Sequence, residues 1–470
     1  SYLRQAIAIT ADPAERAAQH LRAAVSANAA ALHTDAQALV RAAIDLARSS
    51  RDLEAVGAGE ALLGEILIDS GQTAEAVQVL EAAIALFPAT GTGEVRATLL
   101  ATLSRAFMRT GQPARSVETA DLALDLAEHL DLERLVAETF NNKGSSLGYM
   151  GRRREGQALL RAAVEVAHAG GFVAAEIRAL SNSGASTEDP RDGRAAYVAA
   201  RDLALRVGNR NLARWSGEAA RFQAWVLADG WDAILAESAD ERSDDRGSPL
   251  DEARHAAIVA IFKSARGDPT DAELATLDAV AAQVSDRYPG AAAHSLRGNL
   301  AFRNGDYAVA VDESLLATED EELAPYFLED AMRATLWGRD LTRAREVADR
   351  LESDRSTGLQ IDTARLAARA GIAALEGRID DAIAGYREAM SRQRSVGADF
   401  VVASTALDFV RLVGGDHAAT REAAAEARPI FKRVKARPYL ERLDAALVRP
   451  VAEATPSGSV ESRAVSSTPG

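Results

Sequence analysis

The sequence predicts an all-α fold, a right-handed α-α superhelix of about ten to eleven helix pairs. Hydrophobic residues make up 47% of the chain, but aromatic residues only 5%, and alanine dominates the apolar set. Small side chains at this density favour helices that pack closely together. Runs of β-branched or aromatic residues in strict alternation are nearly absent, so no sheet is expected.

A glycine recurs at regular intervals between predicted helices. Gly71, Gly111 and Gly151 are evenly spaced, and the series continues through a turn at residues 189–191. The later members are Gly230, Gly267, Gly305, Gly338, Gly377 and Gly414. Such a fixed period alongside amphipathic helices indicates an array of helix pairs.

The stretch 58–88 shows one unit most clearly. Gly64 lies in the first helix, Gly71 ends that helix, and Leu80 belongs to the second helix before Pro88. A glycine where two helices cross lets their backbones approach, and a bulky residue one turn later fills the gap. Because one pair buries little surface alone, stability has to come from stacking neighbouring pairs.

These residues resemble the tetratricopeptide repeat superfamily over roughly residues 13–447. A unit of that family usually has about 34 residues, whereas the interval here reaches about 40. The longer, alanine- and arginine-rich units are similar to the C-terminal regions of bacterial signal-transduction ATPases, which include LuxR-type regulators and ATPase-linked adenylate cyclases. That resemblance implies an array that follows an ATPase module and senses a ligand or partner. The sequence has no ATPase motif, cyclase domain or helix-turn-helix, so no catalytic residue is carried over.

The regularity fades between residues 171 and 290, and 238–250 has the composition of an exposed loop. We therefore expect N-terminal repeats over 1–240, beginning with a short helix at about 1–10. C-terminal repeats over 241–448 are expected to continue the same solenoid. Residues 449–470 are rich in proline, glycine and serine, which predicts a disordered tail.

The negative charge of the chain argues against partners that are themselves strongly negative. The net charge is −15 and the isoelectric point is near 5.1, which opposes binding to phosphate backbones and anionic membranes. We expect no direct nucleic-acid binding and no membrane association, since no apolar run approaches the roughly 18 residues that a spanning helix needs.

The chain starts without a basic, apolar leader. We expect a cytoplasmic segment of a longer polypeptide.

Catalytic and metal-binding motifs are missing from the sequence. There is no phosphate-binding GxxxxGK[ST] loop, no HExxH and no GxSxG, and there are no cysteines. The glycine-rich stretch 144–151 follows no predicted strand, so its glycines are interpreted as helix-packing residues. The sequence predicts a protein that is not an enzyme and has no catalytic residues, cofactor or metal.

In an array of this kind the first helix of each pair lines the concave face. Arginine, asparagine and aromatic residues at successive turns of those helices could grip an extended peptide. The candidate groove residues are Glu65, Asp69, Arg105, Arg109, Asn141, Ser145, Tyr149, Arg221, Trp225, Arg297 and Phe302.

Three hypotheses remain open at this stage. The leading one is a non-catalytic scaffold or sensor that binds a protein segment within a bacterial signal-transduction or transcriptional regulator. The second is a self-associating array that positions an attached ATPase or cyclase module. The third is a small-molecule effector site in the irregular region 180–250, built from Trp215, Trp225 and Arg221.

Overall fold

The computed structural model describes residues 7, 9–87, 93–240, 247–284, 286–320, 323–354, 356 and 358–448. These residues form helices α2 to α24 and include no strand. The predicted all-α superhelix of helix pairs is confirmed. The predicted tail at 449–470 and most of the leading helix at 1–10 lie outside the described residues, as do residues 241–246 at the expected boundary between the two sets of repeats.

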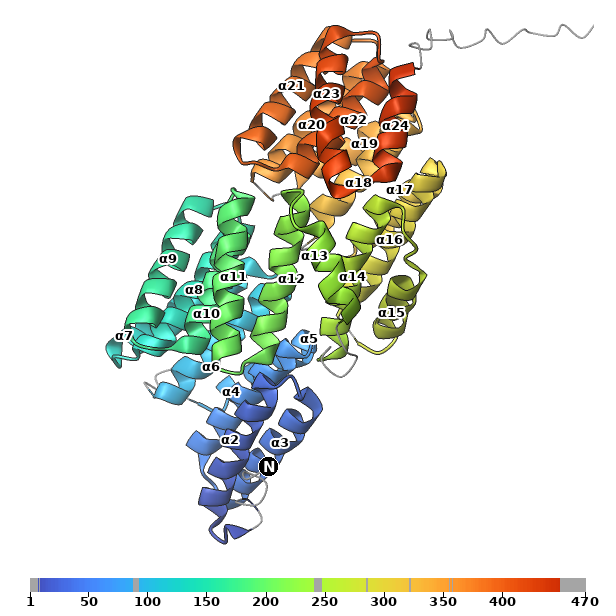
Figure 1. The fold of residues 1–470 in the computed structure, drawn as a ribbon. Coiled ribbons are helices and arrows are strands. Elements are labelled where there is room, and N and C mark those ends of the chain that lie inside the picture. The colour runs from blue at the N-terminus through green and yellow to red at the C-terminus, as the bar shows by residue number, and fades with distance from the viewer. Residues whose placement is uncertain are drawn as a thin grey trace, which may run out of the picture.

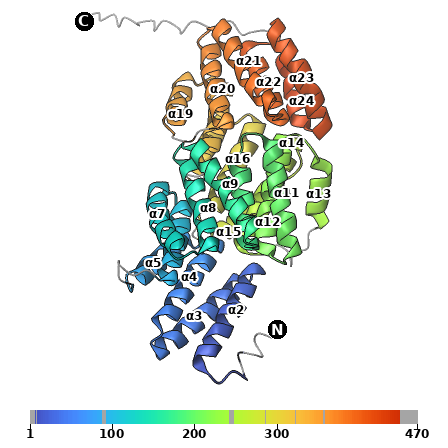
Figure 2. The ribbon, with the colours of Figure 1, turned by 90° about the vertical axis from the view of Figure 1, so that its left-hand side faces the viewer.

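The helices form consecutive pairs that run from one end of the molecule to the other (Figures 1 and 2). The first four pairs are α2 (Pro13–Ala29) with α3 (His33–Ser50), α4 (Leu53–Asp69) with α5 (Thr73–Ile84), α6 (Glu94–Arg109) with α7 (Pro113–His129), and α8 (Glu133–Tyr149) with α9 (Arg153–Ala169). The next four are α10 (Val173–Ser186) with α11 (Pro190–Arg206), α12 (Arg210–Val226) with α13 (Trp231–Asp240), α14 (Pro249–Arg266) with α15 (Asp271–Ala281), and α16 (Tyr288–Asn304) with α17 (Tyr307–Ala317). The last are α18 (Ala324–Trp337) with α19 (Leu341–Ser353), α20 (Leu359–Leu375) with α21 (Ile379–Ser395), and α22 (Asp399–Val413) with α23 (Ala418–Val434), followed by α24 (Arg437–Val448).

Most of the predicted turn glycines have the left-handed backbone that such a turn requires. Gly71, for example, has a φ of 82° and lies two residues after the end of α4. This conformation costs glycine little because it has no Cβ. Gly338 differs from the prediction. It keeps a right-handed backbone at the end of α18, and the positive φ of 58° falls on the next residue, Arg339.

Gly64 and Gly144 lie where two helices cross, as the sequence predicted, whereas Gly148 has open space around it and is not the packing residue that was expected. A Cβ added to Gly64 would come within 2.8 Å of the Leu80 side chain, so the glycine and the leucine fill one contact between α4 and α5. A close crossing joins α8 and α9, where Gly144 and Gly156 face each other's backbone carbonyls. Backbone contact of this kind leaves no room for any side chain.

The superhelix also folds back on itself. Helix α12 contacts both α2 and α22, and α14 contacts α24 (Figure 1). The Arg433 guanidinium donates to the Ala228 carbonyl, 205 positions away in the sequence, at 3.1 Å. Nearby, Lys435 forms an ion pair with Asp232 at 2.9 Å. We call this set of contacts between α12–α14 and α22–α24 the seam.

Aromatic rings fill the centre of the seam. Phe400 at the start of α22 packs on Trp225 and on Trp231, with ring centroids 4.7 and 5.0 Å apart. Trp231 and Phe400 are almost fully buried, and both belong to a core that extends from α12 to α24. Trp225 and Trp231 of the irregular middle region therefore join distant parts of the chain.

The Gly144–Gly156 crossing leads to a testable expectation for stability. In the substitution Gly156→Ala, the new Cβ would lie 2.5 Å from the Gly144 carbonyl oxygen, and overpacking of this kind costs roughly 1–3 kcal/mol. Gly148 on the same helix has nothing within 4 Å of an added Cβ. We expect Gly156→Ala to lower the melting temperature followed by circular dichroism, and Gly148→Ala to leave it unchanged or raise it. Equal melting temperatures for the two variants would contradict the assigned crossing.

Candidate functional site

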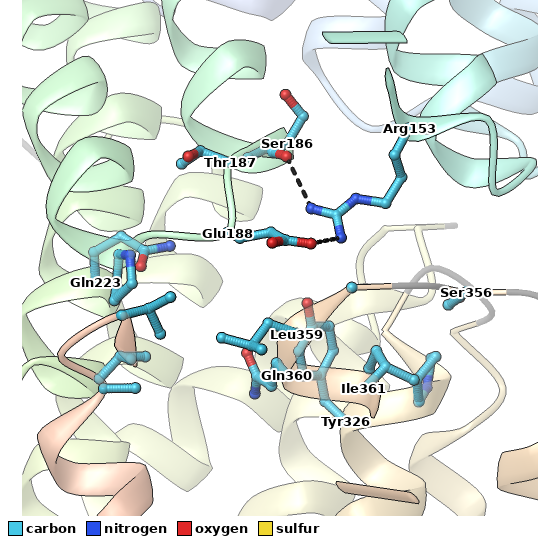
Figure 3. A pocket seen from close by; sticks show the side chains of 18 of the residues that line it. Arg153, Ser186, Thr187, Glu188, Gln223, Tyr326, Ser356, Leu359, Gln360 and Ile361 are labelled. Atoms are coloured by element: carbon cyan, nitrogen blue, oxygen red, sulfur yellow. Dashed lines mark hydrogen bonds and ion pairs between the residues drawn. The ribbon is translucent and has the colours of Figure 1, made fainter. Parts of the chain in front are cut away.

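A cavity of about 260 Å³ lies between two parts of the superhelix that are far apart in the sequence (Figure 3). One wall comes from α8, α9, α12, the second half of α10, the start of α11 and the link between α10 and α11. The opposite wall comes from α18, the start of α20, and the region from the end of α21 into α22. We call this cavity the inter-turn pocket. Its lining includes Ser145, Tyr149, Arg153, Asn182, Glu188, Phe222, Gln223, Tyr326, Gln360, Ile361, Gln393 and Val401.

Arg153 fixes the first wall. Its guanidinium donates to the Glu188 carboxylate and, at 3.3 Å, to the Ser186 carbonyl oxygen, as the dashed lines in Figure 3 mark. Gln157 donates to the same carbonyl at 2.8 Å. These bonds hold the link between α10 and α11 against α9, so the rim of the pocket is well defined.

The two walls meet at Gly358, just before α20. A Cβ added there would lie 3.0 Å from the Arg153 guanidinium, and the glycine has a φ of 138° that other residues rarely adopt. A residue with a side chain at this position would both clash and be strained. Glycine therefore lets the second wall approach Arg153.

A band of polar side chains runs along α4, α6, α8 and α10 toward the pocket. Asp69 accepts hydrogen bonds from Arg105 at 2.6 Å and from Asn28 at 2.8 Å. Further along, Asn182 donates to Asn141 at 2.9 Å. Because Asn182 also lines the inter-turn pocket, the band ends at the cavity. We call it the polar band.

The pKa values of the acids in the polar band reflect their different neighbours. Burial raises the pKa of Glu65 to about 7, and the negative charge of Glu138 adds to the rise, against the effect of Arg105. Burial acts in the same direction on Asp69, but Arg105 and the Asn28 amide outweigh it and lower the pKa of Asp69. In the polar band, Asp69 is thus held in its ionised form, whereas Glu65 titrates near neutral pH.

Burial shifts the pKa of a basic group in the opposite direction, as for Arg178 on α10. Burial lowers its pKa to about 10, with a smaller contribution from the positive charge of Arg105. The guanidinium remains charged at neutral pH and donates to the Asn142 side chain at 2.8 Å. Cations and carboxylates are therefore intermixed along the polar band instead of forming a patch of one sign.

The structure brings together part of the groove set that the sequence predicted. Ser145 and Tyr149 line the inter-turn pocket. Arg109 lies on α6, at the end of the helix that carries Arg105. Glu65, Asp69, Arg105 and Asn141 belong to the polar band. Whether these residues bind a partner stays a prediction.

The other four predicted groove residues are not among those that line the inter-turn pocket. Arg221 forms an ion pair with Glu218 at 2.6 Å, and Arg297 pairs with Asp278 at 2.6 Å. Trp225 packs in the seam, and the Phe302 ring lies under the Arg442 guanidinium with 4.8 Å between cation and ring centre. These four make contacts that hold the fold together.

The residues of the proposed effector site are divided between two places. Trp215 and Arg221 line a separate cavity of about 170 Å³, together with Glu218 and His255. Trp225 is packed against Phe400 instead. Any ligand of that cavity would therefore contact two of the three predicted residues.

Sequence reasoning missed the second wall of the inter-turn pocket. Tyr326, Gln360 and Ile361 come from helices that follow the first wall by many repeats. Nothing in a local pattern indicates which distant repeats meet. The sequence did contain one indication of the first wall, since Arg153 is the middle residue of a run of three arginines.

No group of three or more potential metal ligands occurs among the described residues. No helix within the described ranges is long and apolar enough to cross a membrane.

Comparison with known proteins identifies one repeat directly. Residues 61–90 match the family model described as a tetratricopeptide repeat. The match includes Gly64 and Leu80, which form the α4–α5 contact described above, and Gly71, which lies in the turn between the two helices. A tetratricopeptide repeat is therefore present in the chain, and other helix pairs along the solenoid share its arrangement of two helices around a turn. The comparison with curated proteins finds no match.

Solved structures with similar helical arrays include yeast Tom70, at 12% identity and a TM-score of 0.30. That alignment covers 92% of this chain and 96% of the other. The tetratricopeptide domain of P58(IPK) aligns at 15% identity over 80% of this chain and 98% of its own, with a TM-score of 0.22. The Naa15/Naa10 complex bound to HypK aligns at 11% identity over 92% and 80%, with a TM-score of 0.20.

Glu65 provides a test of the electrostatics of the polar band. Its pKa in the folded chain, about 7, lies above the ordinary value of 4.5. Folding therefore favours the protonated form of Glu65. The stability that this raised pKa contributes is fully present below about pH 4.5 and is lost as the pH rises through about 7. We expect Glu65→Gln to raise the melting temperature, relative to the wild type, more at pH 8 than at pH 5.

The exposed Glu128 on α7 offers a matched control. We expect Glu128→Gln to change the melting temperature by the same small amount at both pH values. If the effect of Glu65→Gln is equally independent of pH, the raised pKa is wrong.

Proposed function

We propose that this chain is a non-catalytic protein-interaction module that binds an extended segment of a partner protein. The observation that supports this most directly is the continuity between the polar band and the inter-turn pocket, which Asn182 links. Concave inner faces of stacked helix pairs offer extended surfaces of this kind. The tetratricopeptide repeat at 61–90 belongs to the same array.

The chemistry of the pocket suits a peptide. An extended segment presents backbone N–H and C=O groups that need partners, and amide side chains can serve both kinds. Gln223 and Gln360 stand on opposite walls, where they can meet such groups. Tyr326 and Ile361 add apolar surface for a side chain of the segment.

The size of the pocket also favours a peptide segment over a small molecule as the ligand. Sites for drug-sized molecules and cofactors usually enclose about 300–1,000 Å³. The inter-turn pocket, at about 260 Å³, falls just below that range. It has room for one or two side chains, while the rest of a bound segment would lie along the polar band.

We also propose that this interaction module is part of a bacterial signal-transduction or transcriptional regulator, located in the cytoplasm. Support comes from the long, alanine- and arginine-rich repeats. A coding sequence upstream of Ser1 that contains a phosphate-binding loop would agree with this context, and one without any ATPase module would contradict it.

The cavity at Trp215 and Arg221 favours a second candidate function, the binding of a small-molecule effector. It encloses about 170 Å³ and combines an aromatic ring with charged groups. Titration of the full chain with a metabolite panel should change tryptophan fluorescence in the wild type and not in Trp215→Phe. A response that survives this substitution would place the effector elsewhere.

The peptide-binding proposal can be tested with peptides selected by display on the full chain. Labelled copies of those peptides would be titrated in fluorescence anisotropy against the wild type and against Tyr326→Ala. Since aromatic anchors in pockets carry much of the binding energy at interfaces, we expect at least tenfold weaker binding, or about 1.4 kcal/mol. Tyr326 is 37% exposed, so its loss should leave the fold intact.

Leu122 on α7 is the matched control, because it is 59% exposed and does not line the pocket. We expect Leu122→Ala to bind the selected peptides as the wild type does. If Tyr326→Ala and Leu122→Ala bind equally well, the peptides occupy another surface and the assignment of the pocket fails. Light scattering over a dilution series of the same samples reveals any self-association.

A further inference from the structure

A second, smaller cavity adjoins the inter-turn pocket. It encloses about 50 Å³ and is lined by residues of α18, α20, α21 and α22. Gln393 and Val401 line both cavities, so the two share a wall. We call the smaller cavity the inner chamber.

Three buried polar atoms of the inner chamber lack a hydrogen-bond partner. They are the Tyr386 hydroxyl, Gln393 Oε1 and Ser404 Oγ, from residues that are 1%, 3% and 9% exposed. Buried polar groups in folded proteins are nearly always paired. The amide oxygen can only accept, and each hydroxyl can accept as well. The chamber is therefore equipped to receive a hydrogen-bond donor.

The charges around the chamber favour a cation. Glu329 and Asp330 line it from α18, and no ion pair within the described part of the chain joins either carboxylate to a basic group. Arg333 is the cation among the described lining residues, and it is already engaged. It donates to Asp408 at 2.8 Å and to the Ser404 carbonyl at 2.9 Å.

The pKa values of the two acids reflect their burial, which the charge of Arg333 only partly offsets. Burial raises the pKa of Glu329 to about 7, and the charges of Asp330 and Asp408 add to the rise. Arg333 and a hydrogen bond with the Gln360 side chain oppose it. Burial likewise raises the pKa of Asp330 to about 6, again against Arg333. The neighbouring helix α24 contributes two further groups. Tyr439 raises the pKa of Arg333, and Arg442 interacts with the charges of Arg333 and Asp408.

We propose that the inner chamber binds a primary ammonium group, which the segment in the inter-turn pocket supplies as a lysine side chain. This inference rests on the proposed peptide-binding function. An ammonium has three donors and no acceptor, which matches the carboxylates and the unpaired oxygen atoms. Its apolar stem would lie along Val401, the apolar residue common to both cavities.

The acceptors of the chamber distinguish an ammonium from a guanidinium. A cavity of roughly 10–15 Å³ is enough for one water molecule, so the chamber, at about 50 Å³, has room for an ammonium group. A planar guanidinium is larger and needs several partners in one plane. The chamber should therefore select lysine over arginine.

Butylammonium is a suitable probe for the full chain, with tetramethylammonium as a cation that has no N–H donor. We expect calorimetric titration at pH 8 to show butylammonium binding at least tenfold more tightly than tetramethylammonium or butylguanidinium. At pH 5 the carboxyls of Glu329 and Asp330 are largely neutral while the amine stays charged. Affinity for butylammonium should then fall at least tenfold.

The double variant Glu329→Gln with Asp330→Asn removes the charges and keeps the shape of the side chains. We expect it to melt no lower than the wild type at pH 8 and to bind butylammonium at least tenfold more weakly. The exposed Glu346 on α19 provides the control Glu346→Gln, which should bind as the wild type does. Equal affinity of the double variant and the wild type would overturn the proposal.

The source of the ammonium is decided by the display-selected peptides. A lysine-containing peptide should displace butylammonium, and replacing that lysine by norleucine should weaken binding at least tenfold. If butylammonium binds but no selected peptide displaces it, the lysine source is wrong. If selected peptides depend on Tyr326 but tolerate norleucine, the peptide-binding function stands and the ammonium site is refuted.

Discussion

The seam between α12–α14 and α22–α24 is the constraint on which the rest of the structure depends. In a simple solenoid each helix pair contacts only its neighbours. Here Arg433 reaches the Ala228 carbonyl and Lys435 reaches Asp232, more than 200 positions away. Trp225 and Trp231 pack on Phe400 at the same place. This contact fixes the distance between the two parts of the superhelix, and the inter-turn pocket lies where their inner faces meet.

The enclosure created by this arrangement changes the chemistry of the inner faces. On an open concave surface, acids such as Glu65 and Glu329 would be surrounded by water. Protein atoms around them instead raise their pKa values to about 7, because burial disfavours the charged form. The two acids have different surroundings. Glu65 lies among Arg105, Arg178 and Glu138 in the polar band, whereas Glu329 faces a chamber whose arginine is already bonded to Asp408.

The sequence was sufficient to predict the repeating part of the fold. The glycine turns and the Gly64–Leu80 contact follow from local conformation and from the period, and Ser145 and Tyr149 follow from the phase of the first helices. The exception at Gly338 shows that a turn can shift by one residue when Arg339 takes the positive φ. The second wall of the pocket could not be predicted, because it depends on small rotations summed over many repeats. For the same reason, nothing in the sequence indicated that Trp225 and Trp231 form the seam.

The contact between α14 and α24 also bears on how the chain folds. Terminal units of a linear array can detach while the remainder stays folded. In this chain Arg437, at the start of α24, bonds to the Arg266 carbonyl and to Asp268, so the last helix stabilises the middle of the molecule. Contacts with such long sequence separation raise the contact order, which slows folding. We infer that the C-terminal helices complete a cooperative unit, whose loss would loosen α12–α14 although no residue there had changed.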